Sequence, residues 1–262
     1  INMRVKCDSL EIMTEDYAPN KVVDDEKHLF IGFKKHLVDD QLINQFYEGE
    51  EIIFEKDDGV FFPNQFLMLV SNSNEKKSAL AKFVNYHSKL ERVVETKDTV
   101  WGLRPRNKEQ TFAIDLLNDP IVPIVTLVGK AGCGKTLLAI AAGLDQVLEK
   151  RMFKKLIVSR PIQPLGKDIG YLPGTMEEKM RPWLMPIQDN IDFLLNGNSK
   201  SMEMFFDDGT IQVEALTYIR GRSISNAYVI IDEAQNLTTH ELKTIITRVG
   251  ENTKIVLTGD VE

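Results

Sequence analysis

One stretch, Ile124–Thr136, constrains the fold of this chain more than any other. It reads IVTLVGKAGCGKT: residues of strand-forming composition run into a glycine-rich turn, and helix formers follow from Leu137 to Leu148. The turn matches G-x-x-x-x-G-K-[ST], the spacing of loops that bind nucleotide phosphates. We therefore predict that this stretch binds a nucleoside triphosphate. The fixed positions of the pattern are Gly129, Gly134, Lys135 and Thr136.

Each part of the stretch has a physical task in holding phosphates. Glycines adopt backbone angles that other residues resist, so successive N–H groups can turn toward an anion. The helix that follows adds its positive end. Lys135 would reach the β- and γ-phosphates, and the hydroxyl of Thr136 would hold Mg²⁺. The loop residues expected to surround the phosphates are Gly129, Lys130, Ala131, Gly132, Cys133 and Gly134.

The composition is that of an ordinary soluble protein, with 43% hydrophobic and 27% charged residues. No apolar run approaches the length of a membrane span. Cys7 and Cys133 are too few for a disulfide framework or a zinc site. We expect a cytoplasmic protein without membrane contact, and 262 residues leave room for two domains. Because the chain begins at Ile1 without an initiator methionine, we also expect that it was cut from a longer one.

The net charge of −7 is uneven, because residues 1–98 carry −6 and residues 99–262 carry −1. A basic field over the whole molecule is therefore absent, and any contact with nucleic acid must use local clusters. Taken one at a time, such clusters are more often a solvated surface than a binding patch. The clusters are Arg104/Arg106/Lys108, Lys150/Arg151/Lys154/Lys155 and Arg220/Arg222.

Residues 18–98 are predicted to form a small β-rich domain. Leu29–Phe33, Glu51–Phe54 and Phe66–Val70 have strand composition. The pair Asp58-Gly59 between apolar segments suggests a β-hairpin, and Lys76–Leu90 fits a short helix or an irregular stretch. The histidines His28, His36 and His87 lack metal-ligand spacing, so packed or solvated roles are expected for them.

A second domain is predicted to start near Thr99. Asn107 is a good N-cap for a helix that runs to Asn118, and Gln110 stands three residues later, as in a capping box. A side-chain amide can also pair with N6 and N7 of adenine. The sequence leaves both roles open for Gln110, although the helix leads directly into the strand before the phosphate-binding loop.

Further elements follow the loop and its helix. Lys155–Ser159 is predicted to be a buried strand, and the long Gly/Pro-rich connection Arg160–Thr175 is of a kind that is usually functional or mobile. Thr175–Leu195 is predicted to be a helical run broken by Pro182 and Pro186. Ile211–Ile224 is strand-like.

A second informative site lies at Tyr228–Ile231, an apolar run that ends in Asp232 and Glu233. A fully apolar run suits a central parallel strand, and open α/β sheets bind ligands at the carboxyl ends of their strands. Asp232 would anchor Mg²⁺, and Glu233 would orient and activate the attacking water. Two solvated acids in a loop are the alternative, but an upstream phosphate-binding loop favours the catalytic interpretation.

The last elements complete the predicted fold class. Thr238 and Glu241 form a capping box that opens a helix over 239–249, with Gly250 as its C′ residue. The next buried strand, Lys254–Leu257, leads into Thr258, Gly259 and Asp260, which would face the γ-phosphate. Parallel strands that alternate with helices predict an α/β fold with an open sheet covered on both faces.

Several segments together resemble the PhoH-like ATPases, which are RecA-like P-loop proteins related to superfamily 1 helicases. The resemblance covers residues 100–262 and rests on GKAGCGKT, RPIQPLGKDIGYLPGT, LTYIRGRSISNAYVIIDEAQN and VLTGD. It implies a RecA-like P-loop NTPase fold, binding of ATP and Mg²⁺, ATP hydrolysis, and action on RNA, with single-stranded RNA as the partner. It also implies a homo-oligomer, by family a hexamer.

The resemblance carries roles to individual residues. It implies that Gln110 contacts adenine, that Asp232 holds the metal with Thr136, and that Glu233 activates water. Gln235 matches the glutamine that follows these acids. Thr258, Gly259 and Asp260 match the third helicase motif, so the catalytic set expected is Lys135, Asp232, Glu233, Thr258 and Asp260.

The sequence departs from the family pattern at its ends. The third motif usually continues to a glutamine, and the chain stops at Glu262, one residue short of it. Residues 1–17 resemble the end of a PIN ribonuclease domain without its acidic residues, so no nuclease activity is assigned. Residues 18–98 then resemble the linker domain. A P-loop kinase and a non-hydrolysing nucleotide-dependent scaffold are the alternative functions. A kinase has less need of a water-activating Glu233 and would need a second substrate pocket, and RNA-stimulated ATP hydrolysis separates all three functions.

Overall fold

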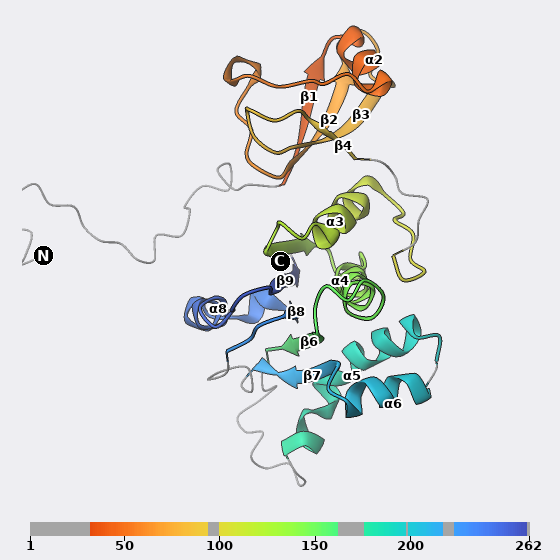
Figure 1. Ribbon diagram of the computed structural model, residues 1–262, viewed down its shortest axis with the longest axis vertical. Helices are drawn as coiled ribbons and strands as arrows, with labels where there is room; N and C mark the ends of the chain where they lie inside the picture. The colour runs from red at the N-terminus through yellow and green to blue at the C-terminus, as the bar shows by residue number, and fades with distance from the viewer. Residues whose placement is uncertain (1–31, 94–99, 162–175, 198, 217–222, 261–262) are drawn as a thin grey trace, which may run out of the picture. The chain divides into compact units, whose positions relative to one another are not determined.

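The computed structural model describes residues 32–93, 100–161, 176–197, 199–216 and 223–260. The chain divides into two compact units between Arg92 and Val93 (Figure 1). The expected segment 1–17 and the expected boundary between residues 98 and 99 lie outside the described residues. Within the described part of the chain, no helix is long and apolar enough to cross a membrane.

The first unit is built on a mixed four-stranded sheet in the order β1-β2-β3-β4. β1 runs parallel to β2, and the remaining neighbours are antiparallel. Helix α2 packs on the sheet through Ile43 and Phe46, which are buried in one apolar cluster with the strands. The β-rich region expected ahead of the phosphate-binding loop is thus confirmed. Its elements are β1 (Phe33–Val38), α2 (Asp40–Glu48), the 3₁₀ turn η2 (Lys56–Asp58), β2 (Gln65–Ser71), β3 (Ser78–Phe83) and β4 (Glu91–Arg92).

The predicted strand and hairpin in the middle of this unit are wrong. Glu51–Phe54 joins no ladder, and Phe54 reaches the core from an irregular segment, where its ring lies 5.3 Å from that of Phe61. At Asp58-Gly59 the chain makes a 3₁₀ turn instead of a hairpin, because the side chains of Glu55 and Asp58 cap that turn reciprocally. Local capping chemistry therefore replaces the strand pairing that the Asp-Gly signal suggested.

The stretch Lys76–Leu90 is also corrected, because strand β3 occupies part of it. β3 pairs antiparallel with β2, and this pairing buries Ala79, Ala81 and Phe83. Burial against a neighbouring strand decides the conformation here more than the local propensity of the residues does.

Among its described residues, the second unit contains five strands, all parallel, in the order β5-β9-β8-β6-β7. This is the α/β architecture expected of a RecA-like P-loop NTPase. The strands are β5 (Ile124–Gly129), β6 (Lys155–Arg160), β7 (Ile211–Ala215), β8 (Ala227–Ile231) and β9 (Lys254–Asp260). The helices and turns are α3 (Lys108–Asn118), α4 (Lys135–Leu144), the π-helical turn η3 (Asp145–Glu149), α5 (Met176–Leu194), α6 (Ser199–Asp207), the 3₁₀ turn η5 (Ala234–Asn236) and α8 (Thr239–Ile246).

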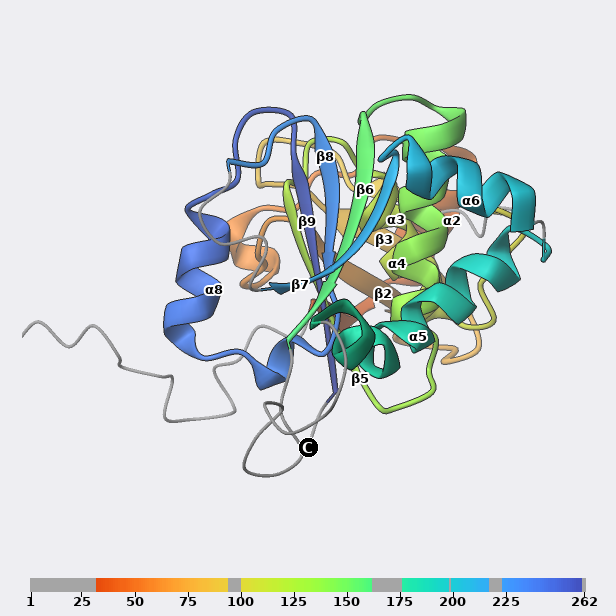
Figure 2. The same cartoon turned by 90° about the horizontal axis from the view of Figure 1, so that it is seen from below.

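Helices cover both faces of this sheet, as Figure 2 shows with α8 on one side and α3, α4, α5 and α6 on the other. The fully buried strand β8 supplies both faces, since successive side chains of a strand point in opposite directions. Tyr228 and Ile230 belong to the apolar cluster with α4 and α5. Val229 and Ile231 belong to a second cluster, where Ile245 of α8 covers them. The prediction of a central strand at Tyr228–Ile231 is therefore confirmed.

Two contacts fix the helices that flank the phosphate-binding loop. A Cβ placed on Gly143 of α4 would lie 2.7 Å from a methyl of Leu156 and 3.0 Å from the ring of Tyr228, so only glycine allows this close approach. At the C-terminal end of α3, the buried Lys254 donates from Nζ to the carbonyls of Leu116 (2.7 Å) and Asp119 (2.6 Å). Both helices are thereby held against the sheet.

The predicted starts of α3 and α8 agree with the structure, whereas the predicted end of α8 does not. Asn107 caps α3, and Thr238 with Glu241 forms the expected capping box of α8. Helix α8 is shorter than predicted, since it ends at Ile246, and the N–H of Gly250 pairs with the Ile224 carbonyl instead of closing the helix.

Two further predictions beyond the loop are corrected. α5 runs through Pro182 and Pro186 without a break, because the burial of Ile187 and Ile191 offsets the hydrogen bond that each proline removes. Strand β7 ends at Ala215, before the predicted Ile224. Residues 162–175 and 217–222, with Arg220 and Arg222, lie outside the described residues.

Candidate active site

The three predicted motifs meet at the carboxyl edge of the parallel sheet. β9 lies between β5 and β8, and the register pairs Gly129 with Asp260 and Ile231 with Leu257. The phosphate-binding loop after β5, the polar end of β9 and the acids after β8 therefore surround one cavity of about 340 Å³. Of the predicted site residues, those that line it are Ala131, Gly132, Gly134, Lys135, Thr136, Asp232, Glu233, Thr258 and Asp260.

The phosphate-binding loop turns through two glycines in the left-handed region. Gly132 has φ +75° and Gly134 has φ +91°, conformations that L side chains rarely adopt. Gly134 is also the N-cap residue of α4, so the unpaired N–H groups of the first helical turn open toward the cavity. The loop thus has the backbone geometry that its sequence predicted.

The ammonium group of Lys135 lies folded back across this loop. It donates to the carbonyls of Gly129 and Lys130, each at 2.9 Å, and forms an ion pair of 2.6 Å with Asp260 Oδ1. Burial acts to lower the pKa of Lys135, but the hydrogen bonds to Asp260 and Cys133 and the negative charge of Asp260 outweigh it. The pKa of Lys135 is therefore raised, and the side chain is a cation at neutral pH.

Two hydroxyl groups converge on one oxygen of Asp232. Thr136 Oγ1 donates to Asp232 Oδ1 at 2.6 Å, and Thr258 Oγ1 donates to the same atom at 2.7 Å. Asp232 is only 7% exposed, and its backbone N–H pairs with the Ser159 carbonyl of β6. This cluster ties the start of α4 to the ends of β8 and β9.

The oxygen-rich cluster has the donors that Mg²⁺ prefers. A hydroxyl and one carboxylate, completed by phosphate oxygens and water, form the usual magnesium site beside a bound nucleotide. Among the described residues, no group of three or more His, Cys, Asp or Glu side chains could hold a metal by itself. Thr136 and Asp232 are therefore the residues that fit a magnesium ion, and the fit requires a phosphate ligand.

Glu233 lies beside this cluster in a strained backbone conformation. Its φ of +54° is left-handed, which costs energy for a residue other than glycine and is found most often at functional sites. Both carboxylate oxygens accept hydrogen bonds: Oε1 from Arg160 Nη2 at 2.9 Å and Oε2 from Gln235 Nε2 at 2.5 Å. Gln235 Oε1 accepts in turn from the Asp260 N–H, so Gln235 joins the end of β9 to Glu233.

Gln110 fastens the start of α3 to the phosphate-binding loop. Its Nε2 donates to the Cys133 carbonyl at 3.1 Å, and its Oε1 accepts from the Arg106 N–H at 2.7 Å. In a regular capping box the side chain of Gln110 would accept from the N–H of the N-cap residue Asn107. Here it accepts from the N–H of Arg106, one residue earlier. Adenine recognition by Gln110 stays a prediction.

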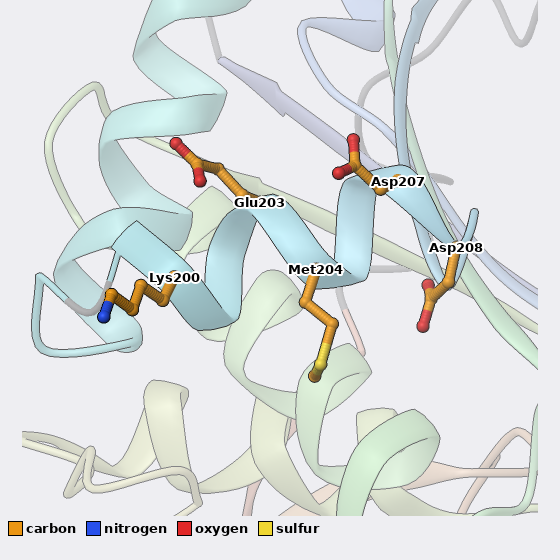
Figure 3. A pocket seen from close by; sticks show the side chains of 5 residues that line it. All are labelled: Lys200, Glu203, Met204, Asp207 and Asp208. Atoms are coloured by element: carbon orange, nitrogen blue, oxygen red, sulfur yellow. The ribbon is translucent and has the colours of Figure 1, made fainter.

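A second hollow lies on the outer surface of α6, and it differs in kind from the cavity. It measures about 620 Å³, and its lining comes from one helix and the residue after it. Figure 3 shows that Glu203 and Asp207 point to one side of this helix while Met204 and Asp208 point to the other. Because the side chains diverge, this hollow lacks the convergent groups of a catalytic site.

Sequence reasoning missed two residues of the site, Arg160 and Asn190. Arg160 directly follows the predicted strand Lys155–Ser159, as Asp232 follows β8, and neighbouring parallel strands end at one edge of the sheet. Its position at the end of a predicted strand could therefore have marked Arg160 as a site residue. Asn190 lines the cavity from α5, and no local pattern of the sequence marks it.

Comparisons with known proteins agree with this architecture. A family model described as "PhoH-like protein" matches residues 102–262. Protein PhoH2 of Bacillus subtilis is 47% identical over 99% of this chain, and Protein PhoH2 of Thermobispora bispora is 38% identical over 99%. Protein PhoH2 of Mycolicibacterium smegmatis is 45% identical over 62%.

The chain spans 59%, 57% and 37% of the lengths of these three relatives, in the same order. The first two alignments cover nearly the whole chain, so they include the residues of the small mixed sheet as well as those of the parallel sheet. The family model covers more than half of the chain and includes every residue of the site described above. The chain belongs to the PhoH family of P-loop proteins.

Proposed function

We propose that the protein is a Mg²⁺-dependent ATPase that couples ATP hydrolysis to the binding and remodelling of single-stranded RNA. The observation that carries the proposal is the joint placement of two groups on one cavity. The Thr136–Asp232–Thr258 cluster supplies oxygen ligands beside the phosphate-binding loop, and Glu233 lies next to it. A loop for phosphates with an adjacent carboxylate for water is the arrangement that phosphoryl transfer to water needs.

Each residue would act by position and charge. The N–H groups of the loop and the first turn of α4 would bind phosphate oxygens, which would also replace Asp260 and the loop carbonyls as acceptors for Lys135. Thr136 and Asp232 would hold Mg²⁺, which when bound neutralises charge on the β- and γ-phosphates. Glu233 would orient a water molecule and accept its proton.

The RNA partner and the oligomeric state rest on family resemblance. Arg104 and Arg106 are exposed and could contact a nucleic-acid backbone, and the hydrogen bond between the Arg106 N–H and Gln110 connects them to the loop. A P-loop kinase would need a second substrate bound in place of the attacking water, and a scaffold would bind ATP without turnover.

ATP hydrolysis by the full-length protein, measured with and without single-stranded RNA or DNA, tests the proposal. Lys135→Ala should abolish hydrolysis and weaken ATP binding, whereas Glu233→Gln should retain ATP binding and lose turnover. Lys243→Ala, on the exposed side of α8, is the control and should behave as the wild type. Unchanged ATPase activity in Lys135→Ala, or turnover near wild type in Glu233→Gln, would contradict the assigned roles.

A further inference from the structure

Arg160 ends strand β6 and holds the carboxylate expected to activate water. The register pairs Ser159 with Ile231, so Arg160 stands beside the two acids that follow β8. Its Nη2 lies 2.9 Å from Glu233 Oε1, and its Nε lies 4.0 Å from Asp232 Oδ2. Arg160 therefore bridges the proposed metal ligand and the proposed base.

This ion pair draws Glu233 toward a residue outside the cavity. Glu233 lines the cavity, whereas Arg160 is not part of its lining. With Oε1 bound to Arg160 and Oε2 bound to Gln235, the orientation of the carboxylate is set by protein donors at both oxygens. A general base has to direct an oxygen at the attacking water. The pair with Arg160 restrains Glu233 from doing so.

The same ion pair is open to competition from solution. The Arg160 side chain is 23% exposed and that of Glu233 is 28% exposed, and partly exposed ion pairs are weak. A guanidinium group binds phosphate with the same forked geometry with which it binds carboxylate. A phosphate group that approaches the carboxyl edge of the sheet can therefore take Arg160 from Glu233.

We propose that Arg160 is a positioning residue that restrains Glu233, and that a backbone phosphate of single-stranded nucleic acid releases this restraint by binding Arg160. The inference rests on the proposed function, because it concerns the rate of the same hydrolytic step. It adds that the bound nucleic acid acts on ATP hydrolysis through one residue, Arg160. Nucleic acid accelerates hydrolysis by exchanging one acceptor of Arg160 for another, with no change in the phosphate-binding loop.

Arg160→Met in the full-length protein tests the link. Without nucleic acid, its kcat for ATP hydrolysis should rise about twofold to fivefold, the range that a partly exposed ion pair corresponds to. Its KM for ATP should stay unchanged. The acceleration by a 20-nucleotide oligouridine RNA, or by its DNA counterpart in a separate arm, should fall toward one. The matched control is Arg248→Met, an exposed arginine after α8, which should keep all three values.

Binding measurements give a readout apart from turnover. The affinity for the labelled oligonucleotide should fall, and the slope of its logarithm against that of the salt concentration should decrease by about 0.7, as for one lost phosphate contact. Arg160→Lys keeps the charge and should retain part of the acceleration. Arg160→Gln, checked by thermal unfolding, serves if the methionine variant does not fold.

The outcomes separate this inference from the proposed function. If the wild type hydrolyses ATP and Arg160→Met lowers kcat with an unchanged acceleration ratio, Arg160 supports the base and the inference is overturned. Hydrolysis that neither RNA nor DNA accelerates, or that polyglutamate accelerates equally, also overturns it and leaves the ATPase intact. A wild type without ATP hydrolysis overturns the proposed function itself.

Discussion

Replacing Thr258 by valine should destabilise the second unit by removing one donor from a buried carboxylate. Thr258 is 1% exposed, and its hydroxyl lies 2.7 Å from Asp232 Oδ1, so valine fills nearly the same volume without the hydrogen bond. Valine suits a strand at least as well as threonine does. The loss therefore measures the hydrogen bond and not a change in packing or propensity.

The expected size follows from the charge of the acceptor. A hydrogen bond to a charged group contributes about 1.5–3 kcal/mol, and the remaining partner is left inside the protein. For units of 150–250 residues, 1 kcal/mol shifts the melting temperature by about 2–4 °C. Thr258→Val should therefore lower the melting temperature by about 3–12 °C at neutral pH.

Differential scanning calorimetry and urea unfolding of the full-length protein measure this effect. Thr258→Ser keeps the hydroxyl and should lose less than half as much free energy of unfolding. Because Thr136 donates to the same oxygen, the Thr136→Val/Thr258→Val double variant should depart from additivity by about 0.5–3 kcal/mol. A Thr258→Val protein within 0.5 kcal/mol of the wild type would refute the argument that this hydroxyl stabilises the acid.

Three further predictions concern other parts of the chain. Burial and the charge of Lys34 lower the pKa of His36 against the opposing effect of Asp58. Because the folded protein resists protonation of His36, its free energy of unfolding is highest above pH 6.5, the usual pKa of histidine, and falls as the pH drops below it. His36→Phe should flatten that loss in urea midpoints between pH 7.5 and 5.5, with NMR titration of His36 as the check. Gly143→Ala should destabilise by about 1–2 kcal/mol, since the clash with Leu156 exceeds the helix-propensity gain, and an unchanged urea midpoint would contradict it. Thr238→Ala should cost about 1 kcal/mol through its capping box and leave the ATPase rate unchanged; a large loss of rate would argue against a purely structural role.

The parallel sheet and the phosphate-binding loop could be predicted because their signals are local. The loop sequence fixes its own backbone through Gly132 and Gly134, and each buried strand is a short apolar run such as Tyr228–Ile231. The capping box of Thr238 and Glu241 is local as well. These elements need no knowledge of distant contacts.

The remaining features depend on the order of the strands in the sheet, which local sequence patterns do not reveal. That β9 separates β5 from β8 decides that Thr258 meets Asp232 and that Asp260 meets Lys135. Arg160 becomes a site residue only because β6 lies next to β8. In the first unit, β3 forms because β2 is its neighbour, so its sequence alone suggested a helix or an irregular stretch.

The strand that carries the phosphate-binding loop is held on one side. Among the described strands β5 pairs with β9 alone, and its residues Ile124, Thr126 and Val128 are exposed on one face. Local opening of β5 would detach the loop while β9, β8, β6 and β7 keep their ladders. We expect the amide protons of β5 to exchange with solvent faster than those of β8. A bound triphosphate at 100 times its Kd would oppose that opening by about 2.7 kcal/mol. The exchange rate of the β5 amide protons would then report the fraction of the protein that has nucleotide bound.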